Sequence, residues 1–139
     1  MTELQKAKSI LIEKSLTCAI VKESETYEST LRGVKPLLDL LESGVDFKGG
    51  FAADKVVGKG AAFLYVLIGI KELYADVISS PALEILVHNG IKTEYRTLVP
   101  NIINRKGDGI CPIETAVLNE TDPKGALIKI KETLKNLFK

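Results

Sequence analysis

The residues best suited to chemistry lie in one stretch, NRKGDGICPIE, which runs from Asn104 to Glu114. Asn104 and Arg105 supply hydrogen-bond donors for an anion, and an arginine can hold a carboxylate or phosphate through two parallel hydrogen bonds. The two glycines allow the backbone to approach a ligand closely. Cys111 precedes Pro112, which fits the first turn of a helix, and a helix N-terminus favours a reactive thiolate. The stretch therefore predicts a structural turn, a lid over a ligand, or a reactive thiol.

A second set of candidate residues lies at the expected N-termini of two helices, in DKVVGKGAAFL and VISSPALEILVHNGI. Helix N-termini present unpaired N–H groups and a positive partial charge, so they attract anions. Lys59 would add a full positive charge there, and Ser79 and Ser80 would add hydroxyls. Alternatively, Lys59 points to solvent and its neighbouring glycines serve only close packing. A lysine in an apolar pocket could also form a Schiff base, although no other residue points that way.

The elements that must position these residues follow from hydrophobic periodicity and turn signals. In chain order we expect a helix at about 3–14, strands at 16–22 and 25–30, a helix at 34–44, and a loop or short strand at 47–53. A helix at 55–68, capped by Asp54, a strand at 71–79, a helix at 81–88, a strand at 91–99, and helices at 112–119 and from 122 onward follow. The first two strands read as a hairpin. The short turns around the helix at 81–88 predict a βαβ unit with parallel strands. The chain thus predicts one domain, 1–139, folded as a three-layer α/β/α sandwich with a mixed sheet.

Composition excludes several classes of function. The chain is 45% apolar and 27% charged with a formal net charge of +1 and no Trp, which gives no strong signal for nucleic acid. No apolar run is long enough for a signal peptide or a bilayer span, so we expect no membrane association. The two distant cysteines read as reduced thiols, which favours a cytoplasmic location. The composition is compatible with a homo-oligomer but locates no interface, and no motif indicates a cofactor.

The expected arrangement of strands and helices would suit a metal site, but the sequence lacks the residues that would bind the metal. In zinc-dependent nucleoside and base deaminases, one helix begins with P-C-x-x-C and another carries H-x-E, whose glutamate works beside the metal-bound water. Aligned at the proline of SSPALEI, the two cysteine positions hold Ala82 and Ile85. Aligned on VGKGAA, Val57 takes the histidine position and Lys59 the glutamate position. A catalytic zinc needs three protein ligands, so we expect no metal site and no zinc-dependent deaminase activity.

Three segments, ADKVVGKGAA, ISSPALEILVHNGI and NIINRKGDGICPIE, together resemble a family of uncharacterised prokaryotic proteins. That family is known only as a domain of unknown function and is placed in the cytidine deaminase-like superfamily. The resemblance covers about Leu16 to Leu137 and implies the deaminase-like α/β/α fold, without an activity.

Two functional hypotheses remain open. The first is a zinc-free protein that binds a small anionic ligand or nucleotide in the vestigial cleft, through Lys59, Ser79, Ser80, Asn104, Arg105 and Cys111. The second is a non-catalytic scaffold or regulatory subunit whose cleft is filled. An open polar pocket between Lys59, Ser80 and the 104–111 loop would distinguish the two. Whether any reaction is catalysed stays open.

Overall fold

The computed structural model describes residues 1–104 and 106–137. Its strands are β1 (Cys18–Lys22), β2 (Glu25–Ser29), β3 (Phe51–Val57), β4 (Glu72–Ser79) and β5 (Lys92–Val99), and its helices are α1 (Glu3–Glu13), α2 (Lys35–Ser43), α3 (Lys59–Ile68), α4 (Ser80–His88), α5 (Pro112–Ala116) and α6 (Pro123–Leu137). The strands form one sheet in the spatial order β2-β1-β3-β4-β5. β1 pairs antiparallel with both β2 and β3, whereas β3, β4 and β5 run parallel. The predicted hairpin, βαβ unit and mixed sheet are therefore confirmed.

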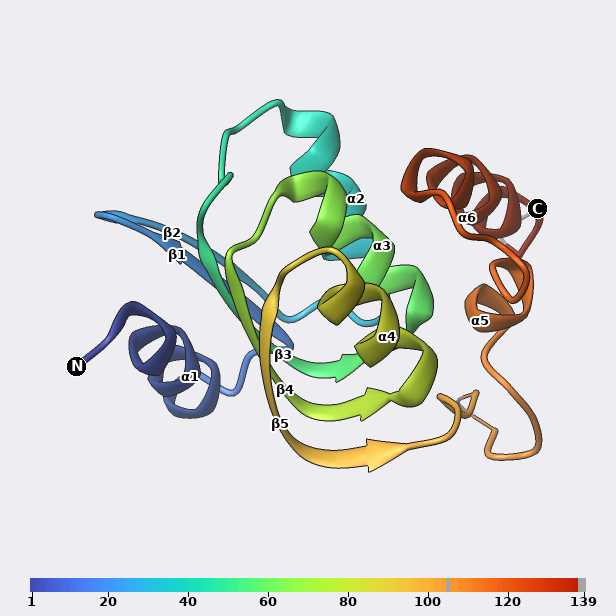
Figure 1. Cartoon of the computed structure of the whole chain (residues 1–139), viewed down its shortest axis with the longest axis horizontal. Helices are drawn as coiled ribbons and strands as arrows, with labels where there is room; N and C mark the ends of the chain where they lie inside the picture. The colour runs from blue at the N-terminus through green and yellow to red at the C-terminus, as the bar shows by residue number, and fades with distance from the viewer. Residues whose placement is uncertain (105, 138–139) are drawn as a thin grey trace.

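The helices cover both faces of the sheet, which gives the predicted three-layer α/β/α sandwich (Figure 1). α1 lies alone on one face, where it contacts β1, β3 and β4. It begins with a complete capping box between Thr2 and Gln5 and buries Leu4, Ala7 and Leu11. α2, α3 and α4 lie on the other face, and α5 and α6 pack on the outer side of α3. Within the described residues no helix is both long and apolar enough to cross a membrane.

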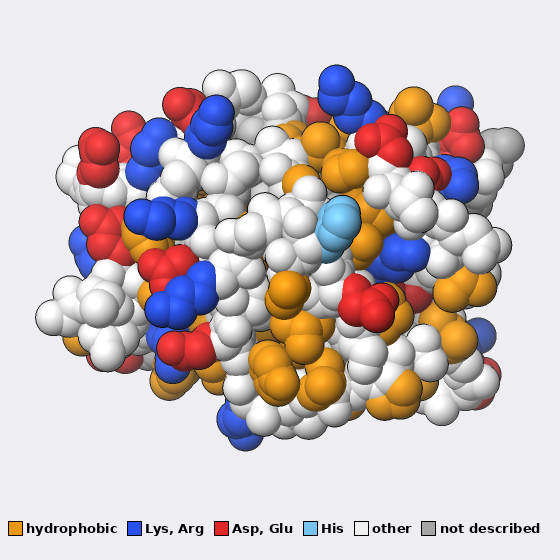
Figure 2. Space-filling model, viewed as in Figure 1, with side chains coloured by type: hydrophobic (Ala, Val, Ile, Leu, Met, Phe, Trp, Pro, Cys, Tyr) orange, Lys and Arg blue, Asp and Glu red, His pale blue; other side chains and the backbone are white. Residues whose placement is uncertain are grey.

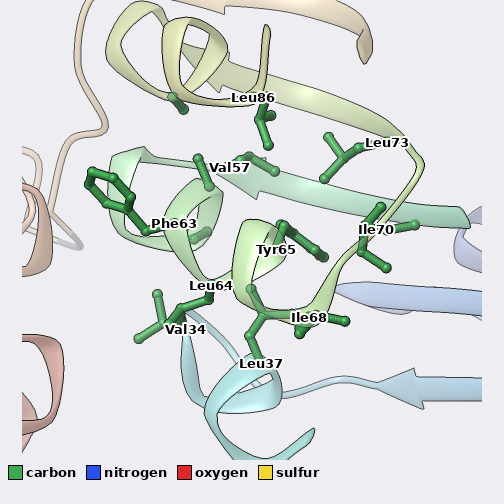
Figure 3. Packing of buried hydrophobic residues seen from close by; sticks show 14 of the residues in the cluster. Val34, Leu37, Val57, Phe63, Leu64, Tyr65, Ile68, Ile70, Leu73 and Leu86 are labelled. Carbon is green, nitrogen blue, oxygen red and sulfur yellow. The ribbon is translucent and has the colours of Figure 1, made fainter. Parts of the chain in front are cut away.

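The larger part of the core surrounds α3, which is apolar on nearly all sides. Its residues Ala61 to Tyr65 are all buried. Figure 3 shows Phe63, Leu64 and Tyr65 among side chains that come from α2, α4 and the strands. The outer side of α3 is covered by α6, which contributes the fully buried Ala126 and Ile130. A helix enclosed by a sheet and a second helix has no solvent-facing stripe, so its sequence carries no amphipathic pattern.

The largest departure from the sequence prediction lies between residues 51 and 68. We expected a helix from about 55, capped by Asp54, but residues 51–57 form strand β3 and the helix begins at Lys59 with Gly58 as its N-cap. Asp54 is buried in the strand, where its carboxylate accepts hydrogen bonds from Tyr65 and from the backbone of Val56. The prediction was wrong because a buried, internally bonded aspartate looks like a cap in the sequence. Elsewhere the boundaries shift by a few residues, as where α5 ends at Ala116 instead of about 119.

Candidate functional site

Two helix N-termini lie side by side at one edge of the sheet. β3 and β4 are neighbouring parallel strands, with Val57 opposite Ile78, and each strand leads directly into a helix. α3 therefore begins beside α4, at the carboxyl ends of their strands. Ser79 caps α4, because its hydroxyl accepts a hydrogen bond from the Ala82 N–H at 3.2 Å. In open α/β sheets this edge is where ligands usually bind.

The Glu114 carboxylate bridges these two N-termini from α5. One of its oxygens accepts the Gly60 N–H at 3.2 Å, and the other accepts the Ser79 hydroxyl at 3.4 Å. Glu114 is only 7% exposed. A Cβ atom added to Gly58 would lie 2.7 Å from the carboxyl carbon, so glycine is needed for this close approach. The chain thus places its own carboxylate between a backbone N–H of the first turn of α3 and the hydroxyl that caps α4.

Of the three candidate residues at the helix N-termini, one contacts Glu114 and the other two form hydrogen bonds elsewhere. Ser79 is fully buried and meets Glu114. The Lys59 ammonium donates to the Leu118 carbonyl at 2.9 Å, beyond the end of α5. The Ser80 hydroxyl is exposed and donates to the Val99 carbonyl at 3.4 Å. Of the three side chains, only Ser79 therefore faces the space between the helices.

The loop from Asn104 to Cys111 is held mainly by bonds within itself. The Asn104 amide donates to the Asp108 carboxylate at 2.9 Å, its backbone N–H donates to the Gly109 carbonyl at 2.8 Å, and the Cys111 N–H donates to the Ile102 carbonyl at 2.9 Å. Gly107 has φ of 76°, the left-handed conformation that a tight turn requires. Arg105 lies outside the described residues. The loop closes as a turn that leads into α5 and so delivers Glu114.

Cys111 and Cys18 occupy different environments, and both are free. Cys111 is half-buried at the N-cap of α5 and packs against the core. Cys18 is fully enclosed in β1, and burial, reinforced by the nearby Asp54, raises the pKa of its thiol. Cys18 is therefore held as the neutral thiol.

A second buried polar cluster connects Cys18, Asp54 and Tyr65, and no sequence pattern predicted it. The Tyr65 hydroxyl donates to the Asp54 carboxylate at 2.6 Å and lies 3.4 Å from the Cys18 sulfur. The Val56 N–H donates a hydrogen bond to the same carboxylate at 3.2 Å. Burial raises the pKa of Asp54 to about 7, against the opposing effect of these hydrogen bonds. The cluster joins β1, β3 and α3 in the core.

Glu114 is the residue whose role sequence reasoning missed. In the sequence Glu114 ends the stretch that begins at Asn104, whereas in the structure its carboxylate contacts Gly60 of α3 and Ser79, the N-cap of α4. The only signal was the pair Gly58 and Gly60. A Cβ atom on Gly60 would lie 2.5 Å from a methyl group of Ile113, so both glycines make room for α5. Among the described residues, no three His, Cys, Asp or Glu side chains are grouped to hold a metal ion.

The chain is thus a mixed-sheet α/β protein in which an internal carboxylate joins two helix N-termini. The family model TM1506, described as Domain of unknown function (DUF1893), matches residues 6–134, so the chain belongs to this family. The crystal structure of a DUF1893 family protein (TM1506) from Thermotoga maritima is similar to it, with a TM-score of 0.85 and 29% identity over 96% of this chain and 89% of that one. No curated protein matches the chain.

Proposed function

We propose that this chain is a non-catalytic scaffold or regulatory protein, built on a cytidine deaminase-like frame whose former cleft is filled by its own Glu114. The observation that carries the proposal is the buried carboxylate between the N-termini of α3 and α4. A carboxylate taken out of water is costly unless donors compensate it, so this placement indicates a permanent structural contact.

An internal carboxylate also competes with any free anion. Glu114 is tethered close to its donors, which gives it a high effective concentration there, whereas a free ligand must lose its translational freedom to bind. Lys59, the residue that could attract such a ligand, is engaged by the Leu118 carbonyl. Both features favour a closed cleft over a binding cleft.

The second candidate function, binding of a small anionic ligand or nucleotide, has one observation in its favour. The space between the two helices already accepts a negatively charged group with hydrogen bonds from Gly60 and Ser79. A phosphate or carboxylate could bind there only by displacing Glu114 and moving α5, which is five residues long. The two candidates therefore differ in whether an added anion stabilises the wild-type chain.

The test is thermal unfolding of the wild type, Glu114→Gln and Glu114→Ala, with and without inorganic phosphate, acetate and nucleotides. We expect no shift of the wild type by any anion. Glu114→Ala should lose about 2–3 kcal/mol of stability because two buried donors lose a charged acceptor, and Glu114→Gln should lose less. Exposed Glu132 on α6 provides the matched control, since Glu132→Ala should change little.

The opposite result would support ligand binding. A ligand at about 100 times its Kd adds roughly 2.7 kcal/mol of stability. A shift of that size in the wild type, abolished by Ser79→Ala, would overturn the filled-cleft proposal. If acetate stabilises Glu114→Ala alone, the donors accept an anion only once the internal carboxylate has been removed, as the proposal expects.

A further inference from the structure

The outer edge of the sheet at β5 is open and long. β5 is eight residues long, is the last strand in the sheet, and is exposed along most of its length. Tyr95 and Leu98 are 42% and 43% exposed. The opposite edge, β2, is shorter and carries only acidic charges, Glu25 and Glu28. A long edge strand with unpaired backbone groups is a template for pairing with another strand, so of the two edges β5 is the better suited to pair with one.

The backbone of β5 presents unused hydrogen-bonding groups at this edge. The Lys92 N–H donates to the Lys71 carbonyl, so residue 92 is bonded toward β4. In a parallel ladder the direction alternates along the strand, which turns residue 94 inward and residues 93 and 95 outward. The N–H and C=O groups of Tyr95 therefore point away from β4, near the middle of the strand.

The charges on β5 are self-complementary about Tyr95. Glu94 forms an exposed ion pair with Lys8 of α1 at 3.0 Å. Two antiparallel copies related by a two-fold axis at Tyr95 would also set Glu94 of each copy opposite Arg96 of the other. An axis at residue 94 would oppose two glutamates, and one at residue 96 would oppose two arginines. Opposite charges across a strand pair stabilise it and like charges destabilise it. Among these neighbouring registers, only the axis at Tyr95 satisfies both charge pairs.

The apolar side of α4 fits the same arrangement. α4 contacts both β4 and β5, and an open groove runs along it. The groove is lined by the apolar Leu83, Ile85, Val87 and Leu98 and by the polar Ser80, Glu84 and His88. Figure 2 shows hydrophobic side chains gathered over this part of the surface. Strands in a sheet are about 4.8 Å apart, so a sheet continued through β5 would place the two α4 helices about 10 Å apart. That is the separation at which helices pack.

We infer that this surface, the β5 edge with Leu83 and Val87 of α4, is the interface of a homodimer in which two sheets join through antiparallel β5 strands centred on Tyr95. The occupant of the surface is a second copy of this chain. The interface is isologous, as a two-fold symmetric dimer requires. It uses backbone pairing, two pairs of Glu94 with Arg96, and apolar contact between helices.

The test is the mass of the full chain in solution, by sedimentation velocity over a range of concentrations. The wild type is expected to dimerise. Glu94→Arg sets arginine against Arg96, and Arg96→Glu sets glutamate against Glu94, so each variant alone should dimerise at least about tenfold more weakly. Mixed together, the two variants are complementary and should form a heterodimer. Glu25→Arg on β2 is the matched control and should leave the dimer intact.

Tyr95→Pro provides a second, independent variant. Proline is tolerated on an edge strand where its missing N–H faced solvent, so the monomer should keep its circular dichroism and lose only the dimer. A wild type that stays monomeric at every concentration would overturn the inference and leave the edge to a strand of another protein. A dimer unaffected by all three β5 variants would equally overturn it. Neither result depends on the state of the Glu114 cleft.

Discussion

The buried carboxyl group of Asp54 should make the stability of this protein fall as pH rises from about 4 to about 7. Burial raises its pKa from the ordinary 3.8 to about 7, so the folded chain holds a proton that the unfolded chain releases. The stabilisation is complete below the unfolded pKa and is lost as pH passes through the folded pKa. A difference of about three pKa units corresponds to about 4 kcal/mol. Small domains are stable by only about 5–15 kcal/mol, so this single group is a large fraction of the total.

The assay is urea unfolding of the wild type and Asp54→Asn between pH 4 and 8. Asparagine is similar in shape and does not titrate, so the difference in free energy of unfolding isolates Asp54 from the other acidic groups. We expect the wild type to lose about 4 kcal/mol relative to Asp54→Asn across this range, with a plateau above about pH 7. Tyr65→Phe removes the hydrogen bond that favours the charged carboxylate, and should move the midpoint to higher pH.

An exposed aspartate provides the control for the direction of the effect. The pKa of Asp46 is lowered, first by the Lys48 N–H and then by the Lys22 charge. The stability that Asp46 contributes is therefore present above its ordinary pKa and is lost as pH falls, which is the opposite of Asp54. This contribution should be small because the carboxylate is exposed to solvent. A pH-independent difference between the wild type and Asp54→Asn would refute the argument, because it would mean that the folded chain accommodates the charged carboxylate as easily as water does.

Three further predictions concern single residues of the core and of the Glu114 contact. Gly60→Ala should destabilise the chain by about 1–3 kcal/mol in urea unfolding, despite alanine's better helix propensity, because its Cβ would meet Ile113 at 2.5 Å. The same substitution made in an Ile113→Ala background should cost less, which would confirm the contact. A Gly60→Ala variant that is more stable than the wild type would contradict it. Lys59→Met should cost no more than about 1 kcal/mol by the same assay, because its bond to Leu118 is exposed. A thiol reagent should label half-buried Cys111 in the folded protein and Cys18 only after unfolding; early labelling of Cys18 would contradict its burial.

Local patterns in the sequence identified most of the architecture. The helices predicted at about 3–14 and 34–44 are present as α1 and α2. The short connections around α4 predicted parallel pairing, since a βαβ unit leaves little other choice. The part of β3 from about residue 55 onward was predicted as helix, because the buried Asp54 is stabilised by Tyr65, eleven residues further along the chain, a partner that no local pattern reveals.

The candidate site was harder to predict because its key contacts are distant in sequence. Glu114 lies 54 residues from Gly60 and 35 from Ser79, so its carboxylate reads locally as a charge at the start of a short helix. The loop before it contains residue types common in anion sites, but the side chain of Asn104 bonds to the carboxylate and the backbone N–H of Asp108. Residue types indicate which chemistry is available, whereas the fold decides which groups remain free to perform it.

The enclosure of α3 between the sheet and α6 has a consequence for biosynthesis. Ribosomes make proteins from the N-terminus, so α3 and both of its flanking strands emerge well before residues 123–137 are joined to the chain. Until α6 arrives, the outer side of an almost wholly apolar helix has no cover, and a nascent chain in that condition is open to chaperones and to aggregation. Ribosome stalling before codon 123 should therefore leave a chaperone-bound intermediate, and completion of the last helix should release it.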